Sequence, residues 1–149
     1  MDIFEELNLH RYINAQDTFT KYGASCMRTE SLRAMREIAS SCVDLAEVQE
    51  KTGDALAKLT HNEGAYISNG AASGIMIATA AALACDDEHI YDALPEITGP
   101  RSEVIMFAGQ RNPYERGCAA VGAKVRYVGT ETCAPTAQEL EDAMTPATA

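Results

Sequence analysis

The sequence predicts an α/β fold with a mostly parallel sheet and helices on both faces. Three short apolar stretches, at residues 65–67, 104–107 and 124–128, alternate with segments that have helical periodicity. Strands separated by helices are typical of parallel sheets, because each helix carries the chain back across one face of the sheet. Ligands of such sheets bind at the carboxyl ends of the strands, so the loops that follow these strands are the candidate site.

Composition excludes several classes of function. The 149 residues are enough for one domain with a core, and the formal net charge of −10 disfavours a nucleic-acid-binding surface. The chain lacks both a basic-then-apolar signal sequence at its start and an apolar run long enough to span a bilayer, so we expect a cytoplasmic protein with no membrane partner. Its five cysteines form no C-x-x-C pair and its three histidines show no ligand spacing, so no metal site is expected.

The chain is expected to begin with an arm and an irregular segment over residues 1–28, followed by a domain over residues 29–149. Residues 11–27 have no helical period. Stretches 13–15 and 18–20 are expected to be extended, with a turn at Gly23. Long irregular segments in compact proteins are often functional or lie on a partner.

Two helices are predicted next. Apolar residues at helical spacing predict a helix over residues 30–42 with one buried face, capped by Thr29. A second helix is predicted from Leu45 or Ala46 to Leu59, where Gly53 costs about 1 kcal/mol relative to alanine. The inner face of this second helix is predicted to consist of Val48, Thr52, Ala55, Leu56 and Leu59.

The stretch from Gly64 to Ala84 is the most informative part of the chain. It predicts a short strand at residues 65–67, a small-residue turn at 68–70 and an apolar helix from residue 71. The unpaired N–H groups at the start of a helix attract anions, and small residues let a phosphate approach the backbone. The alternative is a turn whose glycines serve packing alone. The spacing of Gly70 and Gly74 does not match the G-x-G-x-x-G pattern of dinucleotide-binding proteins.

The second half of the chain continues the alternation. After a surface loop, residues 104–107 form an apolar strand, residues 109–113 a turn and residues 114–121 a helix, which Gly122 is expected to close in a left-handed conformation.

The last two predicted elements are a strand over residues 124–128 and a helix. The helix opens at a capping box formed by Thr136 and Glu139 and continues to Met144.

Three groups of residues carry a family resemblance from about Tyr12 to Ala149. They are Ile13-Asn14-Ala15 with Thr18-Phe19-Thr20 and Gly23-Ala24-Ser25; Val43-Asp44-Leu45 with Glu47, Gln49, Gly53 and Ser68-Asn69-Gly70-Ala71-Ala72; and Gly109-Gln110-Arg111-Asn112-Pro113-Tyr114 with Val121-Gly122-Ala123-Lys124. In order and spacing they resemble the L-seryl-tRNA(Sec) selenium transferase-like family of pyridoxal phosphate enzymes, a group that includes D-glucosaminate-6-phosphate ammonia-lyase-like enzymes.

The resemblance implies part of the large domain of an aminotransferase-like, fold type I enzyme that forms homo-oligomers of two or more subunits. It also implies pyridoxal 5'-phosphate as cofactor and an amino acid or amino sugar acid as the small-molecule substrate. Gln110 stands where family members commonly have histidine, and its flat amide lacks the aromatic face of that residue. The resemblance assigns cofactor binding to Asn69, Gly70, Ala71, Ala72 and Gln110, and substrate binding to Arg111 and Asn112.

No catalytic residue is assigned. Enzymes of this kind need a lysine for the Schiff base and an acid beside the pyridine nitrogen, and the resemblance implies that both lie on later strands. None of the lysines present fits the role: Lys21, Lys51, Lys58 and Lys124. The hypothesis is the N-terminal part of a pyridoxal-phosphate-dependent lyase or transferase that is inactive by itself. The alternative is a non-catalytic remnant or dimerising fragment without cofactor.

Overall fold

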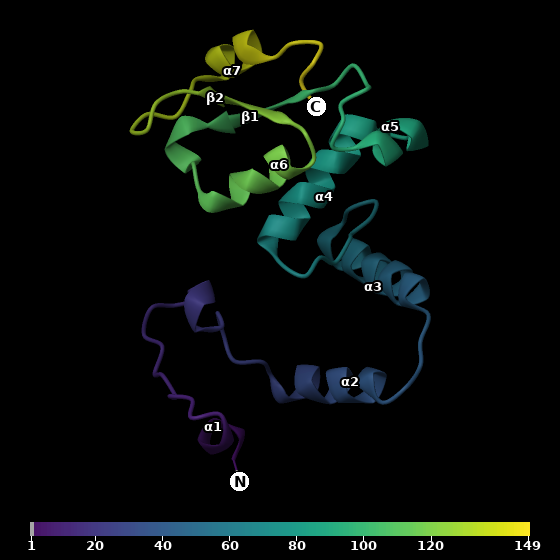
Figure 1. Ribbon diagram of the computed structural model, residues 1–149, viewed down its shortest axis with the longest axis vertical. Helices are drawn as coiled ribbons and strands as arrows, with labels where there is room; N and C mark the ends of the chain where they lie inside the picture. The colour runs from purple at the N-terminus through teal and green to yellow at the C-terminus, as the bar shows by residue number, and fades with distance from the viewer. Residues whose placement is uncertain (1) are drawn as a thin grey trace. The chain divides into compact units, whose positions relative to one another are not determined.

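The computed structural model describes residues 2–149 and has the α/β character that the sequence predicts (Figure 1). The chain divides into two compact units, Met1–Val48 and Gln49–Ala149. The expected arm over residues 1–28 remains a prediction.

The first unit contains the short helix α1 (Ile3–Glu6), a 3₁₀ turn (Thr20–Tyr22) and helix α2 (Thr29–Ala39). Between α1 and α2 the chain is irregular, as predicted. The extended stretch expected at residues 18–20 is wrong, because Thr18 lies in a bend and Thr20 begins the 3₁₀ turn. Gly23 has a φ of 82°, which confirms the predicted glycine turn.

Asn14 organises this irregular segment through its side chain. Its Nδ2 donates to the carbonyl oxygens of Asp17 at 2.6 Å and Ala24 at 3.3 Å, and its Oδ1 accepts from the Gln16 N–H at 2.9 Å. The side-chain amide of Asn14 therefore holds together the loop between residues 14 and 24. Such bonding to nearby backbone is characteristic of asparagine in turns.

Helix α2 begins and ends earlier than predicted. Thr29 is its first helical residue, so Arg28 rather than Thr29 occupies the cap position, and no side chain caps the helix there. The helix ends at Ala39, because Ser40 turns the chain and donates its N–H to the carbonyl of Glu37.

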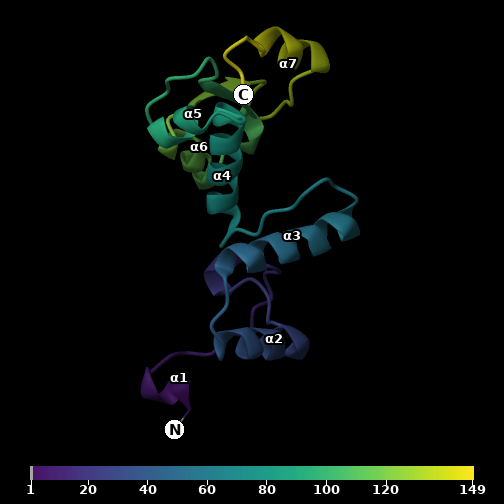
Figure 2. The ribbon, with the colours of Figure 1, turned by 90° about the vertical axis from the view of Figure 1, so that its right-hand side faces the viewer.

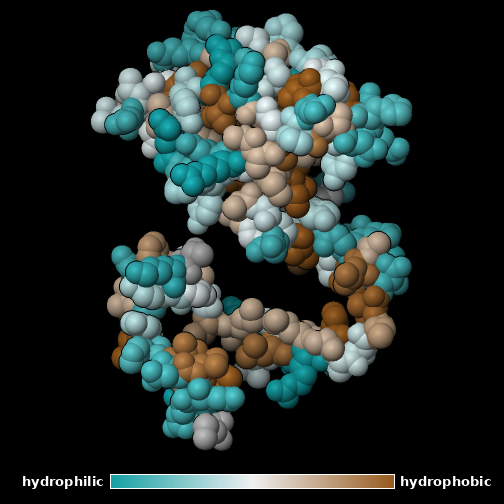
Figure 3. Space-filling view, viewed as in Figure 1, coloured by the Kyte–Doolittle hydropathy of each residue, from teal (hydrophilic) through white to brown (hydrophobic). Residues whose placement is uncertain are grey.

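The buried face predicted for α2 is wrong for the described chain. Leu32, Met35 and Ile38 lie at helical spacing but remain 52%, 55% and 49% exposed. Figure 3 shows hydrophobic residues, in brown, on the surface of α2. An amphipathic stripe becomes buried only when another element packs on it, and none of the residues described in the first unit buries this one.

Helix α3 (Leu45–Thr60) matches the prediction in its bounds and differs in its buried face. Its buried residues are Gly53 and Ala57, whereas Leu56 and Leu59 are 38% and 76% exposed. A Cβ atom at Gly53 would overlap the carbonyl oxygen of Ala65, so the helix meets the segment that leads to α4 at a position without a side chain. Gly53 is therefore a contact position as well as a weak helix former.

The strand predicted at residues 65–67 is not formed. Residues 65–67 have no regular secondary structure. The side-chain amide of Gln49 donates to the carbonyl of Ile67 at 3.2 Å, but no strand pairs with this segment within residues 2–149. A strand needs a neighbour that satisfies its backbone groups. Tyr66 and Ile67 consequently stay 66% and 46% exposed.

The sheet has two parallel strands, β1 (Glu103–Phe107) and β2 (Lys124–Val128), in place of the three expected. Both lie where the sequence predicts them, with Glu103 opposite Lys124. On the other edge of β1, Thr148 forms a parallel bridge with Glu103, and the Ala149 N–H donates to the Glu103 carbonyl at 2.9 Å.

Helices lie on both faces of this sheet, as predicted. In Figures 1 and 2, α7 (Ala137–Ala143) covers one face, while α4 (Ala71–Ala84) and α6 (Arg116–Ala120) lie on the other. Helix α5 (Glu88–Ala93) packs on α4. The core lies between the sheet, α4 and α6, and Leu83, Cys118 and Ala123 form its buried cluster.

Two predicted helix signals are confirmed. The helix expected at residues 114–121 is a 3₁₀ turn (Pro113–Glu115) followed by α6, and Gly122 closes it with a φ of 90°. At α7, Thr136 accepts from the Glu139 N–H at 3.2 Å and Glu139 accepts from the Thr136 N–H at 2.8 Å. The capping box therefore forms in both directions. Within the described residues, no helix has the length and hydropathy needed to cross a bilayer.

Candidate functional site

The start of α4 presents backbone N–H groups that have no partner. Gly70 is the cap residue, with a φ of 156° that favours glycine, and no side chain caps the helix. The first helical bond runs from the Gly74 N–H to the Gly70 carbonyl at 2.9 Å. In residues 2–149, no acceptor lies opposite the N–H groups of Ala71, Ala72 and Ser73. An uncapped helix start of this kind can bind an anion, and its binding of one here remains a prediction.

Small residues shape the turn before α4. Ser68 Oγ donates to the Gly70 carbonyl at 3.0 Å, and it would lie 3.1 Å from a Cβ atom at Gly74. Gly74 thus leaves room for the Ser68 side chain beneath the turn. On the outer side, no atom lies within 4 Å of a Cβ placed on Gly70. The turn is therefore held on the side of Ser68 and open on the side of the exposed residues Asn69 and Gly70.

Helix α6 packs against the first turn of α4. A Cβ atom at Gly117 would lie 2.9 Å from the Ala72 carbonyl oxygen and 3.3 Å from the Met76 nitrogen. Further along α4, the Thr79 hydroxyl approaches Cys118 Sγ at 3.4 Å. The 3₁₀ turn Pro113–Glu115 also contacts α4. The structure therefore brings the segment after β1 to α4. The role of Gly117 could not be recognised from the sequence, where its only local signal is a glycine within a short predicted helix.

The loop after β1 carries the other predicted site residues, in a 3₁₀ turn (Ala108–Gln110) and the two residues after it. The side chain of Asn112 is committed to the loop itself: Oδ1 accepts from the Tyr114 N–H at 2.9 Å and Nδ2 donates to the Gln110 carbonyl at 3.0 Å. The side chain of Gln110 is exposed, and none of the described residues forms a hydrogen bond with its amide.

Arg111 is held by two residues that the sequence analysis missed. Its guanidinium carbon lies 4.4 Å from the centre of the Tyr127 ring, and its Nη2 lies 3.4 Å from Glu115 Oε1. Tyr127, followed by Glu115, raises the pKa of Arg111 above its ordinary value, so the guanidinium stays charged. Glu115 stands four residues after Arg111, a spacing that signals an ion pair, whereas Tyr127 is on the next strand.

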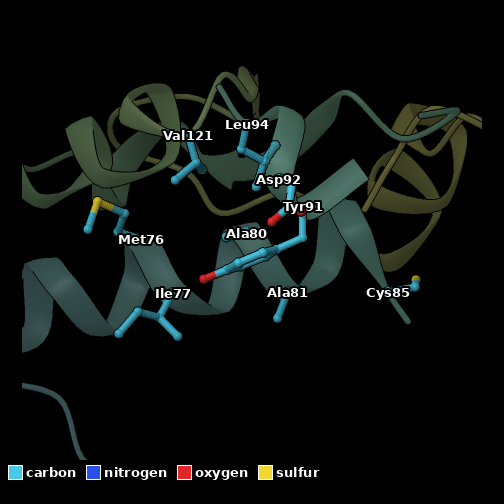
Figure 4. A pocket seen from close by; sticks show the side chains of 9 residues that line it. All are labelled: Met76, Ile77, Ala80, Ala81, Cys85, Tyr91, Asp92, Leu94 and Val121. Carbon is cyan, nitrogen blue, oxygen red and sulfur yellow. The ribbon is translucent and has the colours of Figure 1, made fainter. Parts of the chain in front are cut away.

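Two of the pockets in this unit bear on the site. The first, of about 390 Å³, is lined by Ala108, Gly109, Arg111 and Glu131 at the carboxyl end of the strands. The second, of about 510 Å³, is apolar and runs along α4 and α5, where Met76, Ile77 and Tyr91 face it (Figure 4). None of the predicted site residues lines the larger pocket, so size alone does not mark the site.

The lysines of the second unit lie on α3 and β2 and not in these loops. Lys124 begins β2 and therefore lies at the amino end of a strand, whereas the Arg111 loop follows the carboxyl end of β1. Lys51 is on the exposed surface of α3, 3.8 Å from Glu50 Oε1, and Lys58 is in the last turn of the same helix.

No family model matches the chain. The chain is 32% identical to D-glucosaminate-6-phosphate ammonia lyase from Salmonella typhimurium (strain 14028s / SGSC 2262), over 99% of this chain and 41% of that protein. It is also 29% identical to the 5'-C-glycyluridine monooxygenase-decarboxylase of a Streptomyces species, over 74% of this chain and 28% of that protein.

A solved structure of D-glucosaminate-6-phosphate ammonia-lyase superposes on 99% of this chain with a TM-score of 0.89 and 31% identity. The match covers 41% of that structure, so the chain spans about two-fifths of the length of this relative. The chain is a homologue of D-glucosaminate-6-phosphate ammonia lyase, which confirms the predicted resemblance to enzymes of that kind.

Proposed function

We propose that this chain is the N-terminal part of a pyridoxal-phosphate-dependent lyase or transferase of the cytoplasm that acts on an amino acid or amino sugar acid. The observation that carries the proposal is the uncapped start of α4, where three consecutive N–H groups lack acceptors beside an open turn. The relative's name supports the substrate class, because it specifies an amino sugar acid phosphate.

The residues at the start of α4 fit the phosphate of the cofactor. N–H groups at a helix start point at the ligand, and the helix dipole adds a partial positive charge there. The proposed cofactor-binding residues Asn69, Gly70, Ala71 and Ala72 are all exposed, and three of them have side chains no larger than a methyl group. A phosphate can therefore approach the backbone without displacing a side chain.

The loop after β1 is proposed to act on the ring and the substrate. Gln110 has an exposed amide that is free to cover one face of the pyridine ring. Arg111 keeps a charged guanidinium that suits a carboxylate or phosphate of the substrate. Asn112 contributes mainly by shaping the loop, because both ends of its amide are used there. When bound, pyridoxal phosphate supplies the electron sink for bond cleavage at the substrate α-carbon.

A dimerising fragment without cofactor is the second candidate, and the exposed apolar side chains favour it. Leu32 and Met35 of α2 are half exposed, and Met76 and Ile77 of α4 are each 37% exposed beside the apolar pocket. Figure 3 shows hydrophobic colours along α4 as well as α2. Apolar patches of this kind are typical of protein–protein interfaces. We therefore propose a homo-oligomer in either case.

Retention of pyridoxal phosphate separates the two candidates. The chain is mixed with the cofactor and passed through gel filtration, and absorbance of the cofactor is followed in the protein peak. We expect retention by the wild type and loss of retention in Gly70→Asp, which adds a carboxylate to the anion site and strains the backbone at a φ of 156°.

Gly64→Asp is the matched control. It also adds a carboxylate at an exposed glycine with no atom within 4 Å of its Cβ, but outside the turn. Equal retention by the two variants would overturn the phosphate placement, and no retention by the wild type would favour the dimerising fragment.

A further inference from the structure

The geometry points to a carboxylate receptor at Arg111, with Tyr127 and Glu115 as the positioning residues that hold its guanidinium. The inference rests on the proposed function, since the receptor would bind the substrate of that same enzyme. It adds the class of group that Arg111 takes and the two residues on which that binding depends. Neither Tyr127 nor Glu115 belongs to the site residues expected from the sequence.

Tyr127 and Glu115 constrain different parts of the guanidinium. Tyr127 lies under one face, with the guanidinium carbon 4.4 Å from the ring centre. At one edge of the guanidinium, Nη2 donates a hydrogen bond to Glu115 Oε1 at 3.4 Å. The side chain of Arg111 is still 55% exposed, and Glu115 is the one carboxylate among the described residues that pairs with it. The planar guanidinium of Arg111 is therefore held in place, and it still has N–H donors for a second planar anion.

Glu115 is itself well placed to fix Arg111. Its side chain is only 19% exposed, and its 3₁₀ turn contacts α4. Its other oxygen, Oε2, is buried and has no hydrogen-bond partner among residues 2–149. A carboxylate in this position depends on the nearby guanidinium for its charge partner. A fixed partner lowers the entropy that Arg111 would lose on binding a ligand.

The neighbouring pocket indicates the class of ligand. It has a volume of about 390 Å³ and is lined by Ala108 and Gly109 together with two opposite charges, those of Arg111 and Glu131. Arg111 suits the carboxylate of a ligand, while Glu131 accepts hydrogen bonds from hydroxyl groups and repels a second negative charge. The pocket therefore fits a monoanionic, hydroxylated carboxylic acid better than a phosphate dianion.

The test uses the whole chain and two probes, sodium gluconate and inorganic phosphate, without pyridoxal phosphate. Binding is followed by NMR through the Arg111 Nε–H signal and the Tyr127 ring signals, so that each affinity is assigned to this site. We expect gluconate to shift both signals at lower concentration than phosphate. Arg111→Gln is expected to weaken gluconate binding about tenfold or more, because it removes a charge-assisted bond.

The positioning residues are tested by conservative pairs. Tyr127→Leu removes the aromatic face and is expected to weaken gluconate binding about twofold to fivefold, the ratio for an exposed cation–π contact. Tyr127→Phe keeps the face and is expected to restore the wild-type affinity. Glu115→Gln keeps the shape of the side chain without its charge and is expected to broaden the Arg111 signal and weaken binding. Tyr91→Leu, on α5, is the control for loss of a tyrosine.

Three results would overturn the inference: gluconate affinity unchanged in Arg111→Gln, equal affinity in the Phe and Leu variants of Tyr127, or tighter binding of phosphate than of gluconate at this signal. The Gly70→Asp variant separates this inference from the proposed function. If it loses pyridoxal phosphate but still binds gluconate, both stand. If wild type binds gluconate but never retains the cofactor, the receptor stands and the cofactor proposal fails.

Discussion

Gly117 of α6 packs directly against the carbonyl oxygen of Ala72 in the first turn of α4. A Cβ atom at position 117 would lie only 2.9 Å from that oxygen. Because Ala72 is one of the proposed phosphate-binding residues, the packing of α6 fixes the backbone of the candidate site. The contact joins residues 45 positions apart, and it depends on the absence of a side chain at Gly117.

Gly117→Ala should destabilise the chain although alanine is the better helix former. The propensity gain is about 1 kcal/mol, whereas overpacking against a backbone oxygen costs about 1–3 kcal/mol. We expect a net loss of free energy of unfolding in urea and weaker retention of pyridoxal phosphate. Gly64→Ala, where no atom lies within 4 Å of the new methyl, should stay within about 0.5 kcal/mol of wild type. A stabilised Gly117→Ala protein would show that α6 is not in close contact with α4.

Gly53→Ala tests the contact between α3 and the segment that leads to the turn. The new methyl would overlap the Ala65 carbonyl oxygen, so the segment must shift. We expect a loss of about 1–3 kcal/mol in urea unfolding. Ala55→Gly on the exposed side of the same helix gives the opposite control, in which only propensity changes, by about 1 kcal/mol.

The capping box of α7 should make stability depend on pH through Glu139. The Thr136 N–H and hydroxyl stabilise the ionised carboxylate, which lowers the pKa of Glu139 below its ordinary value of 4.5. A lowered folded-state pKa contributes stability above the unfolded pKa, and that contribution is lost as pH falls through the folded value. Glu139→Gln should therefore be less stable than wild type at pH 7, and the difference should shrink below pH 4.5.

The measurement is the free energy of unfolding of both proteins across this pH range. Glu141→Gln removes a carboxylate from the same helix outside the capping box and should not reproduce the effect. A difference between wild type and Glu139→Gln that stays constant from pH 7 to pH 3 would contradict the account.

Arg126→Met should loosen α7 from the sheet. The Arg126 Nη1 donates to the Ala143 carbonyl at 2.9 Å and lies 3.4 Å from Glu103 Oε2, so one side chain joins β2, α7 and β1. Bonds from a charged donor are worth about 1.5–3 kcal/mol, and partial exposure places the expected loss near the lower value. Arg116→Met, at an arginine without an ion pair in the described residues, should change urea unfolding little. Equal effects of the two variants would refute the role of Arg126.

Local signals in the sequence predicted local structure well. Thr136 and Glu139 lie three residues apart in a capping box, Gly122 follows a helix, and small residues at Gly70 precede one, so each could be recognised from its neighbours alone. The alternation of strands and helices likewise predicted the parallel pairing of β1 and β2.

Contacts between distant parts of the chain could not be predicted in this way. The inner face of α3 is set by the approach of Ala65 to Gly53, which overrides the apolar spacing of Leu56 and Leu59. The strand expected at residues 65–67 lacks a neighbour within the described chain. The stacking of Arg111 on Tyr127 depends on strand order and register, which no local pattern specifies.

The most direct test of the central claim, that the start of α4 binds the cofactor phosphate, compares pyridoxal phosphate with pyridoxal in backbone N–H spectra of the chain. The account predicts that pyridoxal phosphate shifts the amide signals of Gly70, Ala71, Ala72 and Ser73, and that pyridoxal, which lacks the phosphate, leaves them unchanged. Identical shifts with the two compounds, or phosphate-dependent shifts confined to other residues, would contradict it.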